Sequence, residues 1–318
     1  MINFILLTIL CSTYGLFFPI GKLIIETHAI ITPLYLIGIR FAIAGLMCMA
    51  YVAFYQKKWT VFTTKHILPI LIVSLLSIHA TNALELWALQ HMDAGKTCFI
   101  YSCAPIISAI LGYIVYQERL TGIQIIALIA GTLGFLPVIL DGTNTESTMF
   151  WSFSYPELAI FASAILTITG WMFVKKLNQN MSFLQVNGTS MFVGGLTALV
   201  HAVGTETSTF VTQWHDHAGM IVMSIAGLLI LSNLISYNLH AFLLTRMSVT
   251  MINFACLSCS FFAALFSFLI IGEPMKFSLV QSMFIVIPAL SIYFLEQMKP
   301  GYLATQWKQC RAKKIAKA

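Results

Sequence analysis

The chain is 318 residues long, with 59% hydrophobic and only 9% charged residues. A soluble domain carries about 25% charged residues, because its surface has to be compatible with water. This composition excludes a soluble globular protein and indicates an integral membrane protein.

The net charge of +6 does not indicate nucleic-acid binding, because much of it lies in one short tail. Six cationic residues follow the last apolar segment: Lys299, Lys308, Arg311, Lys313, Lys314 and Lys317. There they suit attraction to the anionic lipids of a cytoplasmic leaflet. The lipid bilayer is therefore an expected partner, and nucleic acid is not.

Apolar stretches long enough to cross a hydrocarbon core of about 30 Å recur along the chain. They predict ten transmembrane helices, over 3–25, 33–55, 66–91, 94–116, 120–140, 154–176, 182–202, 217–245, 247–271 and 278–297. Thr32-Pro33 places proline at a first helical position, and Ser154-x-x-Glu157 is typical of a capping box. Kinks or interruptions are expected at four prolines within spans: Pro19, Pro105, Pro137 and Pro288.

The segment from 82 to 118 has a counterpart 155 residues downstream, from 237 to 273. Each copy reads as the end of an apolar helix, a short polar turn and a second apolar helix that stops at a glutamate, Glu118 or Glu273. The order of helices and turns matches better than the individual residues do. A duplicated five-helix unit is therefore predicted. Because five is odd, the second copy enters the membrane from the opposite side.

The expected fold is an all-α integral membrane protein with ten transmembrane helices in two inverted five-helix repeats. The first repeat spans 1–141 and the second 154–297, with an extracytoplasmic linker over 142–153 and a basic cytoplasmic tail over 298–318. With the N-terminus inside, 13 Lys and Arg residues fall in cytoplasmic segments and three on the opposite side: Lys22, Lys96 and Lys276. We therefore expect both termini in the cytoplasm of a multi-pass protein of the cell inner membrane.

Several short motifs are spread over nearly the whole chain. They are Tyr14-Gly15-x-x-Phe18, Pro33 with Arg40-Phe41, Ala88-Leu89-Gln90-His91-x-x-Ala94-Gly95, Pro105, Glu118, Gly170-Trp171-x-Phe173 and Gly272-Glu273. With these motifs the chain resembles the drug/metabolite transporter superfamily, in particular its ten-helix EamA-type members. The resemblance implies a central cavity between the two halves and carriage of a small organic metabolite. Glu85 departs from the pattern, because many relatives have an aromatic or apolar residue there.

Ionisable residues inside membrane spans are costly, so each is a candidate for a functional role. Glu85 and its counterpart in the second repeat, His240, would each lie about 10 Å from a membrane surface and could frame a midplane site. Arg40, in the second span, needs a carboxylate, carbonyl groups or an anionic substrate group. Structural alternatives stand beside these roles, because Glu85 could accept hydrogen bonds from Asn82 and Arg40 could form a salt bridge.

Six aromatic residues lie in spans that, by the family resemblance, surround the central cavity: Tyr14, Phe18, Trp87, Tyr101, Trp171 and Tyr237. Their rings can stack on a planar substrate and attract cations, and their polar tips can form hydrogen bonds. In a chain with 13% aromatic residues, packing or lipid contact is the alternative for each. Asn82 could contact substrate or join two helices through hydrogen bonds.

Signals for a metal or cofactor are weak in this sequence. Cys256-x-x-Cys259 has a redox or zinc spacing, but no second pair or neighbouring histidine completes it, so helix packing is the preferred interpretation. His215-Asp216-His217 lacks a supporting cluster. The sequence contains no phosphate-loop, zinc-protease or nucleophile-elbow motif. We therefore expect no metal, no cofactor and no ATP hydrolysis.

These features together predict a secondary transporter that works by alternating access. Its substrate would be a small polar metabolite, amino-acid-like or nucleoside-like, and zwitterionic or cationic. The more specific alternative is uptake or exchange of S-adenosylmethionine and S-adenosylhomocysteine in an intracellular bacterium, a family group that Phe284-Ile285-Val286-Ile287-Pro288 resembles. A coupling proton or a counter-transported metabolite could drive either. An intramembrane enzyme is the remote alternative, disfavoured because Asp93, Asp141 and Asp216 lie in loops or at span ends.

Overall fold

The computed structural model describes residues 2–27, 32–57, 59–89, 91, 100–138, 155–206, 219, 222–223, 225–272, 275 and 277–298. In these ranges the secondary structure is helical, without a strand. Seven of the described helices are long and apolar enough to cross a membrane, and three shorter apolar helices bring the set to ten. Each predicted span coincides with one of them, which confirms an all-helical membrane protein.

The first half of the chain forms α1 (Ile2–Thr27), α2 (Pro33–Tyr51), α3 (Thr64–Ile72), α4 (Thr81–Leu89), α6 (Ala104–Tyr116) and α7 (Gly122–Leu133). The second half forms α9 (Tyr155–Leu177), α10 (Phe183–Thr205), α12 (Asn238–Leu244), α13 (Val249–Ala255), α14 (Cys259–Ile271) and α15 (Phe277–Met298). As predicted, α2 begins at Pro33, after Thr32 at the N-cap.

Several spans change helical geometry along their length. A π-helical segment over Val73–Ala80 joins α3 to α4, and another over Leu229–Tyr237 precedes α12. A 3-10 turn over Cys256–Ser258 joins α13 to α14. At the 155-residue offset, 73–80 maps onto 228–235 and the turn residue Cys103, just before α6, maps onto Ser258. The two halves thus interrupt corresponding helices at corresponding places, as a duplicated unit would.

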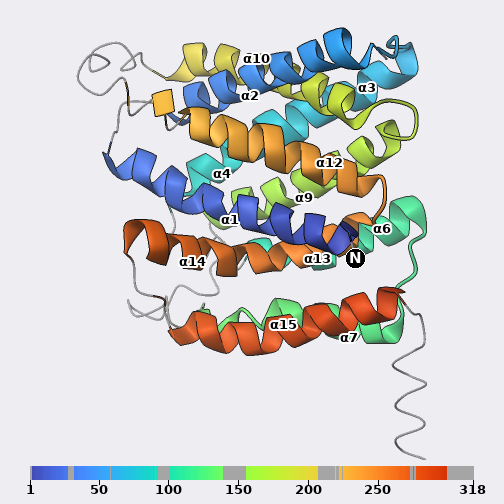
Figure 1. Ribbon diagram of the computed structural model, residues 1–318, viewed down its shortest axis with the longest axis vertical. Helices are drawn as coiled ribbons and strands as arrows, with labels where there is room; N and C mark the ends of the chain where they lie inside the picture. The colour runs from blue at the N-terminus through green and yellow to red at the C-terminus, as the bar shows by residue number, and fades with distance from the viewer. Residues whose placement is uncertain are drawn as a thin grey trace, which may run out of the picture.

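The helices stack in layers (Figure 1). The pair α2 and α10 lies with α3 at one end of the stack, and α7 packs against α15 at the other. Between them lie α1, α4, α9 and α12, and α1 also packs against α14. The pairs α2–α10 and α7–α15 each join a helix of one half to its counterpart in the other. Both halves therefore contribute helices to the middle of the bundle.

Glycines allow α2 and α10 to approach closely. A Cβ atom added at Gly195 would clash with the backbone of Ala42, and one at Gly45 would clash with the backbone of Phe192. Helices in lipid associate through this kind of close packing, because the surrounding acyl chains offer no hydrophobic advantage to contact between helices. The α2–α10 pair thus anchors Arg40, which lies on α2 two residues before Ala42.

The structure agrees with some of the remaining sequence predictions and differs from others. Pro105 follows the interruption at Cys103, and Pro137 follows a turn at 134–135, as predicted. At Pro19 and Pro288 the helices α1 and α15 continue without an interruption, so of the two expected outcomes only a kink is compatible with the structure there. Glu118 forms an ion pair with Lys175 at the end of α9, with 2.9 Å between Glu118 Oε1 and Lys175 Nζ. Ser154, Glu273, the 142–153 linker, the 215–217 motif and the tail beyond Met298 lie outside the described residues.

Candidate functional site

Tyr237 stands at the centre of the candidate site, at the end of the π-helical segment that precedes α12. Its ring makes edge-on contacts with Phe41 on α2 and Tyr14 on α1, at centroid distances of 5.4 and 6.5 Å. Trp171 on α9 lies 5.4 Å from the same ring. Four aromatic residues from four spans therefore meet in the interior, a surface to which a flat or apolar part of a ligand can bind.

His240 lies one turn beyond Tyr237 and extends this aromatic group. Its imidazole stacks on Trp171, with centroids 3.8 Å apart and planes 5° from parallel. The Tyr14 hydroxyl lies 3.3 Å from His240 Nδ1. Only 2% of His240 is exposed, and its Nε2 has no hydrogen-bond partner among the described residues. The ring is thus held in place by stacking and one hydrogen bond, with a buried polar atom left over.

Two opposite charges also lie near Tyr237. The Glu85 carboxylate, on α4, interacts with the Tyr101 hydroxyl and with the Arg40 guanidinium. Tyr237 is within electrostatic range of both charged groups. Arg40 is only 4% exposed, with its guanidinium 5.1 Å from the centroid of the Phe41 ring. Burying charges in a membrane protein is costly unless they are paired, so this arrangement has a stabilising or a binding role.

Neighbouring polar residues hold the charged end in place. The Tyr101 hydroxyl lies 2.9 Å from Ser163 Oγ on α9. Asn82 donates a 2.6 Å hydrogen bond to the Ile78 carbonyl and interacts with the Tyr237 side chain. These bonds tie α4, α9 and the segment before α12 together. The positions of Glu85 and Tyr237 are therefore fixed from both halves of the chain.

The structure brings most of the predicted site residues into one connected network, which we call the central cluster: Tyr14, Arg40, Asn82, Glu85, Tyr101, Trp171, Tyr237 and His240. Two predicted residues are not part of it. Trp87 is 43% exposed and lies against His91, whose Nδ1 is 2.8 Å from the Trp87 carbonyl. The side chain of Phe18 lies outside the described residues.

Phe41 and Ser163 contact the central cluster but were not singled out from the sequence. Phe41 directly follows Arg40 in the family-like motif, which was the only signal for it. Ser163 lies in an ordinary apolar stretch of α9, and its bond to Tyr101 depends on packing between the two halves. Serine hydroxyls often bond within their own helix, as Ser163 also does with the Ile160 carbonyl at 2.8 Å. A partner in another span could therefore not be inferred from the residue type.

Two cavities lie away from the central cluster, at the end of the bundle where the sequence predicts the cytoplasm. One of about 440 Å³ is lined by residues that include Asn3, Lys175 and Arg246. The other, of about 620 Å³, is lined by Gln56, Thr60 and the turn after α9. Neither is lined by a residue of the central cluster. Within the cluster, Trp171 and His240 are buried, whereas Glu85 and Tyr101 are partly exposed.

The EamA-like transporter family model matches residues 1–140 and 154–295 of this chain. One crystal structure of a protein with 12% sequence identity superposes with a TM-score of 0.71, over 92% of this chain and 98% of the other. That likeness concerns the fold alone. The two family matches coincide closely with the two predicted repeats.

Two of the following three curated relatives are transporters by name. The S-adenosylmethionine/S-adenosylhomocysteine transporter of Chlamydia muridarum (strain MoPn / Nigg) is 28% identical over 280 residues, covering 86% of each chain. The protein of the same name from Chlamydia trachomatis serovar L2 is 28% identical over 292 residues, or 91% of this chain and 88% of that one. A chloroplastic WAT1-related protein of Arabidopsis thaliana is 21% identical over 85% of this chain and 64% of its own length.

Proposed function

This chain belongs to the EamA-like transporter family, and we propose that it carries S-adenosylmethionine across the cell inner membrane in exchange for S-adenosylhomocysteine. Family membership makes it a multi-pass membrane transporter of small molecules. The named substrate of the two chlamydial relatives supports the finer assignment, because each match extends over most of both chains. We place both termini in the cytoplasm, from the distribution of Lys and Arg.

The observation that carries this proposal is the placement of two opposite charges, Arg40 and Glu85, within electrostatic range of each other and beside aromatic rings. S-adenosylmethionine has a carboxylate, an ammonium group, a sulfonium cation and a flat adenine ring. Arg40 would bind the carboxylate through its planar guanidinium. Glu85 would bind the ammonium group and lower the cost of bringing the sulfonium into the membrane. Each charge of the central cluster thus has an opposite charge on the ligand.

The aromatic residues complement the rest of the ligand. Trp171, Tyr237 and Tyr14 present ring surfaces of a size suited to adenine, and offset or edge-on contacts between aromatic rings are favourable. Ring faces also attract cations, including a sulfonium. S-adenosylhomocysteine keeps the adenine, the ammonium group and the carboxylate, so the same residues would bind it.

Exchange of these two compounds moves charge. S-adenosylmethionine carries one more positive charge than S-adenosylhomocysteine, because only the former has a sulfonium. Each cycle of uptake would therefore bring one net positive charge into the cell. A membrane potential that is negative inside would favour uptake, by about 2.3 kcal/mol per charge and 100 mV. No coupling proton is needed in this scheme.

A simple zwitterionic amino acid is the second candidate substrate. The opposite charges of Arg40 and Glu85 favour it, because they match a carboxylate and an ammonium group. It would leave the rings around Tyr237 without a ligand contact. Competition between a labelled amino-acid mixture and S-adenosylmethionine separates the two assignments.

The proposal is tested by uptake of labelled S-adenosylmethionine into vesicles that contain the purified protein and are loaded with S-adenosylhomocysteine. We expect Glu85→Gln to reduce uptake at least tenfold. Glu118→Gln serves as the matched control, because Glu118 pairs with Lys175 at the end of the bundle and not in the central cluster. Equal uptake by wild type and a folded Glu85→Gln protein would contradict the proposed site. Uptake of amino acids alone would favour the second candidate.

A further inference from the structure

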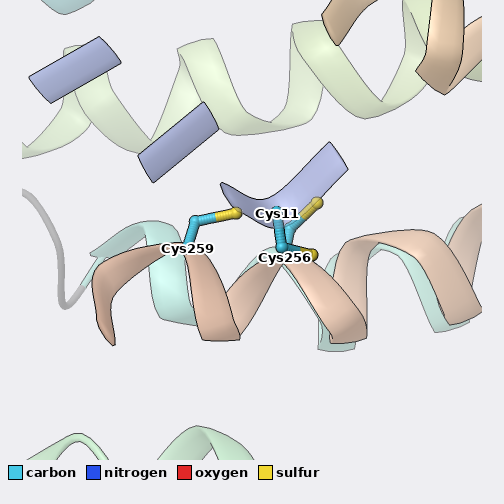
Figure 2. Close-up of side chains that lie close together, drawn as sticks. All are labelled: Cys11, Cys256 and Cys259. Atoms are coloured by element: carbon cyan, nitrogen blue, oxygen red, sulfur yellow. The ribbon is translucent and has the colours of Figure 1, made fainter. Parts of the chain in front are cut away.

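Three cysteines from two spans meet next to the central cluster (Figure 2). Cys11 lies on α1, Cys256 begins the 3-10 turn after α13, and Cys259 begins α14. Their three Sγ atoms lie within 4.8 Å of one another. All three are free thiols. The sequence showed only the pair at 256 and 259, because the third sulfur comes from the other end of the chain.

Packing holds the three thiols together. Cys11 and Cys259 are 2% and 8% exposed, and the Cys11 thiol lies 3.3 Å from the Ala255 carbonyl. Gly15 allows α1 to come this close, because a Cβ atom there would be 2.9 Å from the Cys259 carbonyl oxygen. Cys11 lies one turn before Tyr14, whose hydroxyl contacts His240. The thiols are therefore next to the rings of the central cluster.

We propose that Cys11, Cys256 and Cys259 form a three-sulfur binding site for a soft, thiophilic ion, best matched by trivalent arsenic. Thiolates favour soft ions. In the described part of the chain no histidine or carboxylate joins this group. With bonds to sulfur of about 2.3 Å, as zinc has, the three sulfurs around a pyramidal trivalent arsenic lie roughly 3.4 Å apart. The three Sγ atoms, which lie within 4.8 Å of one another, can reach this separation by small rotations of their side chains.

Charge selects among the soft ions. Three thiolates around monovalent copper leave a net charge of −2, and around divalent zinc a net charge of −1. Around trivalent arsenic the complex is neutral. An uncompensated charge is expensive inside a membrane protein, so the neutral complex is favoured. Structural zinc sites also have four protein ligands, whereas trivalent arsenic is satisfied by three.

The binding reaction is balanced without an oxidant. Arsenous acid has three As–OH bonds, each of which is replaced by an As–S bond. Each released hydroxide leaves as water with the proton of one thiol, so three waters form and neither arsenic nor sulfur changes oxidation state. The product links α1 to the junction of α13 and α14. Because alternating access requires helices to move, this link would hold the carrier in one state.

Binding is tested on the full chain with Cys48, Cys98, Cys103 and Cys310 replaced by serine, so that only the three proposed ligands remain. With arsenite as the probe, we expect one arsenic per chain and three sulfur neighbours in its X-ray absorption spectrum. A further Cys11→Ser, Cys256→Ser or Cys259→Ser replacement should weaken binding at least tenfold. Two or fewer sulfur neighbours, or tighter binding of zinc or copper(I), would overturn the proposal.

Folding and function are separated by two further measurements. If the fourfold serine variant does not fold, Cys259→Ser is compared with Cys103→Ser in the otherwise unchanged chain, and only the former should lose arsenic. The link to movement rests on the proposed function. Arsenite should inhibit S-adenosylmethionine exchange by wild type and Cys103→Ser but not by Cys259→Ser. If arsenic is bound by three sulfurs but transport is not inhibited, the binding site is confirmed and its effect on helix movement is excluded. If untreated protein shows no exchange, that result contradicts the proposed function and not the arsenic site.

Discussion

The imidazole of His240 is stacked on the indole of Trp171, with ring centroids 3.8 Å apart, and its Nδ1 atom lies 3.3 Å from the Tyr14 hydroxyl. Three spans, α1, α9 and α12, thus meet at one side chain. His240 is the repeat counterpart of Glu85 at the 155-residue offset. One half of the chain supplies an acid at this position and the other half a stacked ring.

The first prediction concerns the hydrogen bond of His240. Phenylalanine at this position keeps the stacking on Trp171 but cannot bond to Tyr14. One such bond contributes about 1 kcal/mol, which is roughly a fivefold effect. We expect His240→Phe to raise the KM for S-adenosylmethionine exchange by that factor, because Tyr14 is no longer held in its orientation toward the ligand. The melting temperature should fall only slightly, because the buried Nε2 atom that has no partner among the described residues is removed as well. A loss of folding in His240→Phe would show instead that the imidazole is a structural element.

The second prediction separates stability from binding at Arg40 and Glu85. Removing one member of a buried charge pair leaves the other uncompensated and costs about 3 kcal/mol. Arg40→Gln should therefore lower the melting temperature of the detergent-solubilised protein. The double variant Arg40→Gln/Glu85→Gln should regain most of that stability and still fail to transport. If both single variants and the double variant melt at the wild-type temperature, the two residues do not interact in the membrane interior.

The third prediction compares one substitution at two places on α10. A methyl group at Gly195 meets the backbone of Ala42, whereas the space around Gly204 is open. Overpacking costs about 1–3 kcal/mol, and alanine favours a helix over glycine by about 1 kcal/mol. Gly195→Ala should therefore destabilise the protein and Gly204→Ala should leave it unchanged or slightly more stable. The measurement is thermal unfolding in one detergent, and equal effects at the two sites would contradict the packing of α2 on α10.

The fourth prediction concerns a helix cap supplied by another span. Glu206, just after α10, accepts hydrogen bonds from the Thr32 hydroxyl and from the backbone N–H groups of Leu34 and Tyr35 at the start of α2. A carboxylate at a helix N-terminus satisfies unpaired donors and favours the positive end of the helix dipole. We expect Glu206→Ala to cost about 1 kcal/mol and Glu206→Gln less, by thermal unfolding. Glutamine keeps an accepting oxygen but lacks the negative charge. If Glu206→Gln lowered the free energy of unfolding as much as Glu206→Ala does, the stabilisation would come from the charge and not from the hydrogen bonds.

The positions of the spans could be predicted from the sequence, because the bilayer requires an apolar stretch of nearly fixed length for each crossing. The start of α2 at Pro33 followed from proline's missing N–H. The π-helical segments and the break at Cys256–Ser258 could not be predicted, because no proline or glycine marks them. They depend on packing between spans.

The central cluster was predicted in part, for a similar reason. Charges such as Glu85 and Arg40 stand out in an apolar span, so their role inside the bundle could be inferred. Aromatic residues do not stand out, and helical rotation decides whether each faces the interior. Trp171 faces inward and is 5% exposed, whereas Trp87 is 43% exposed. Cys11 was missed because its partners come from the opposite end of the chain.

The most direct measurement of the proposed function is exchange under an imposed membrane potential. Vesicles that contain the protein and S-adenosylhomocysteine are given labelled S-adenosylmethionine outside, with a potassium diffusion potential set negative or zero inside. We predict uptake that requires internal S-adenosylhomocysteine and is faster at the negative potential, because one positive charge enters per cycle. Uptake that is indifferent to internal S-adenosylhomocysteine, or no uptake at either potential, would contradict an S-adenosylmethionine/S-adenosylhomocysteine exchanger.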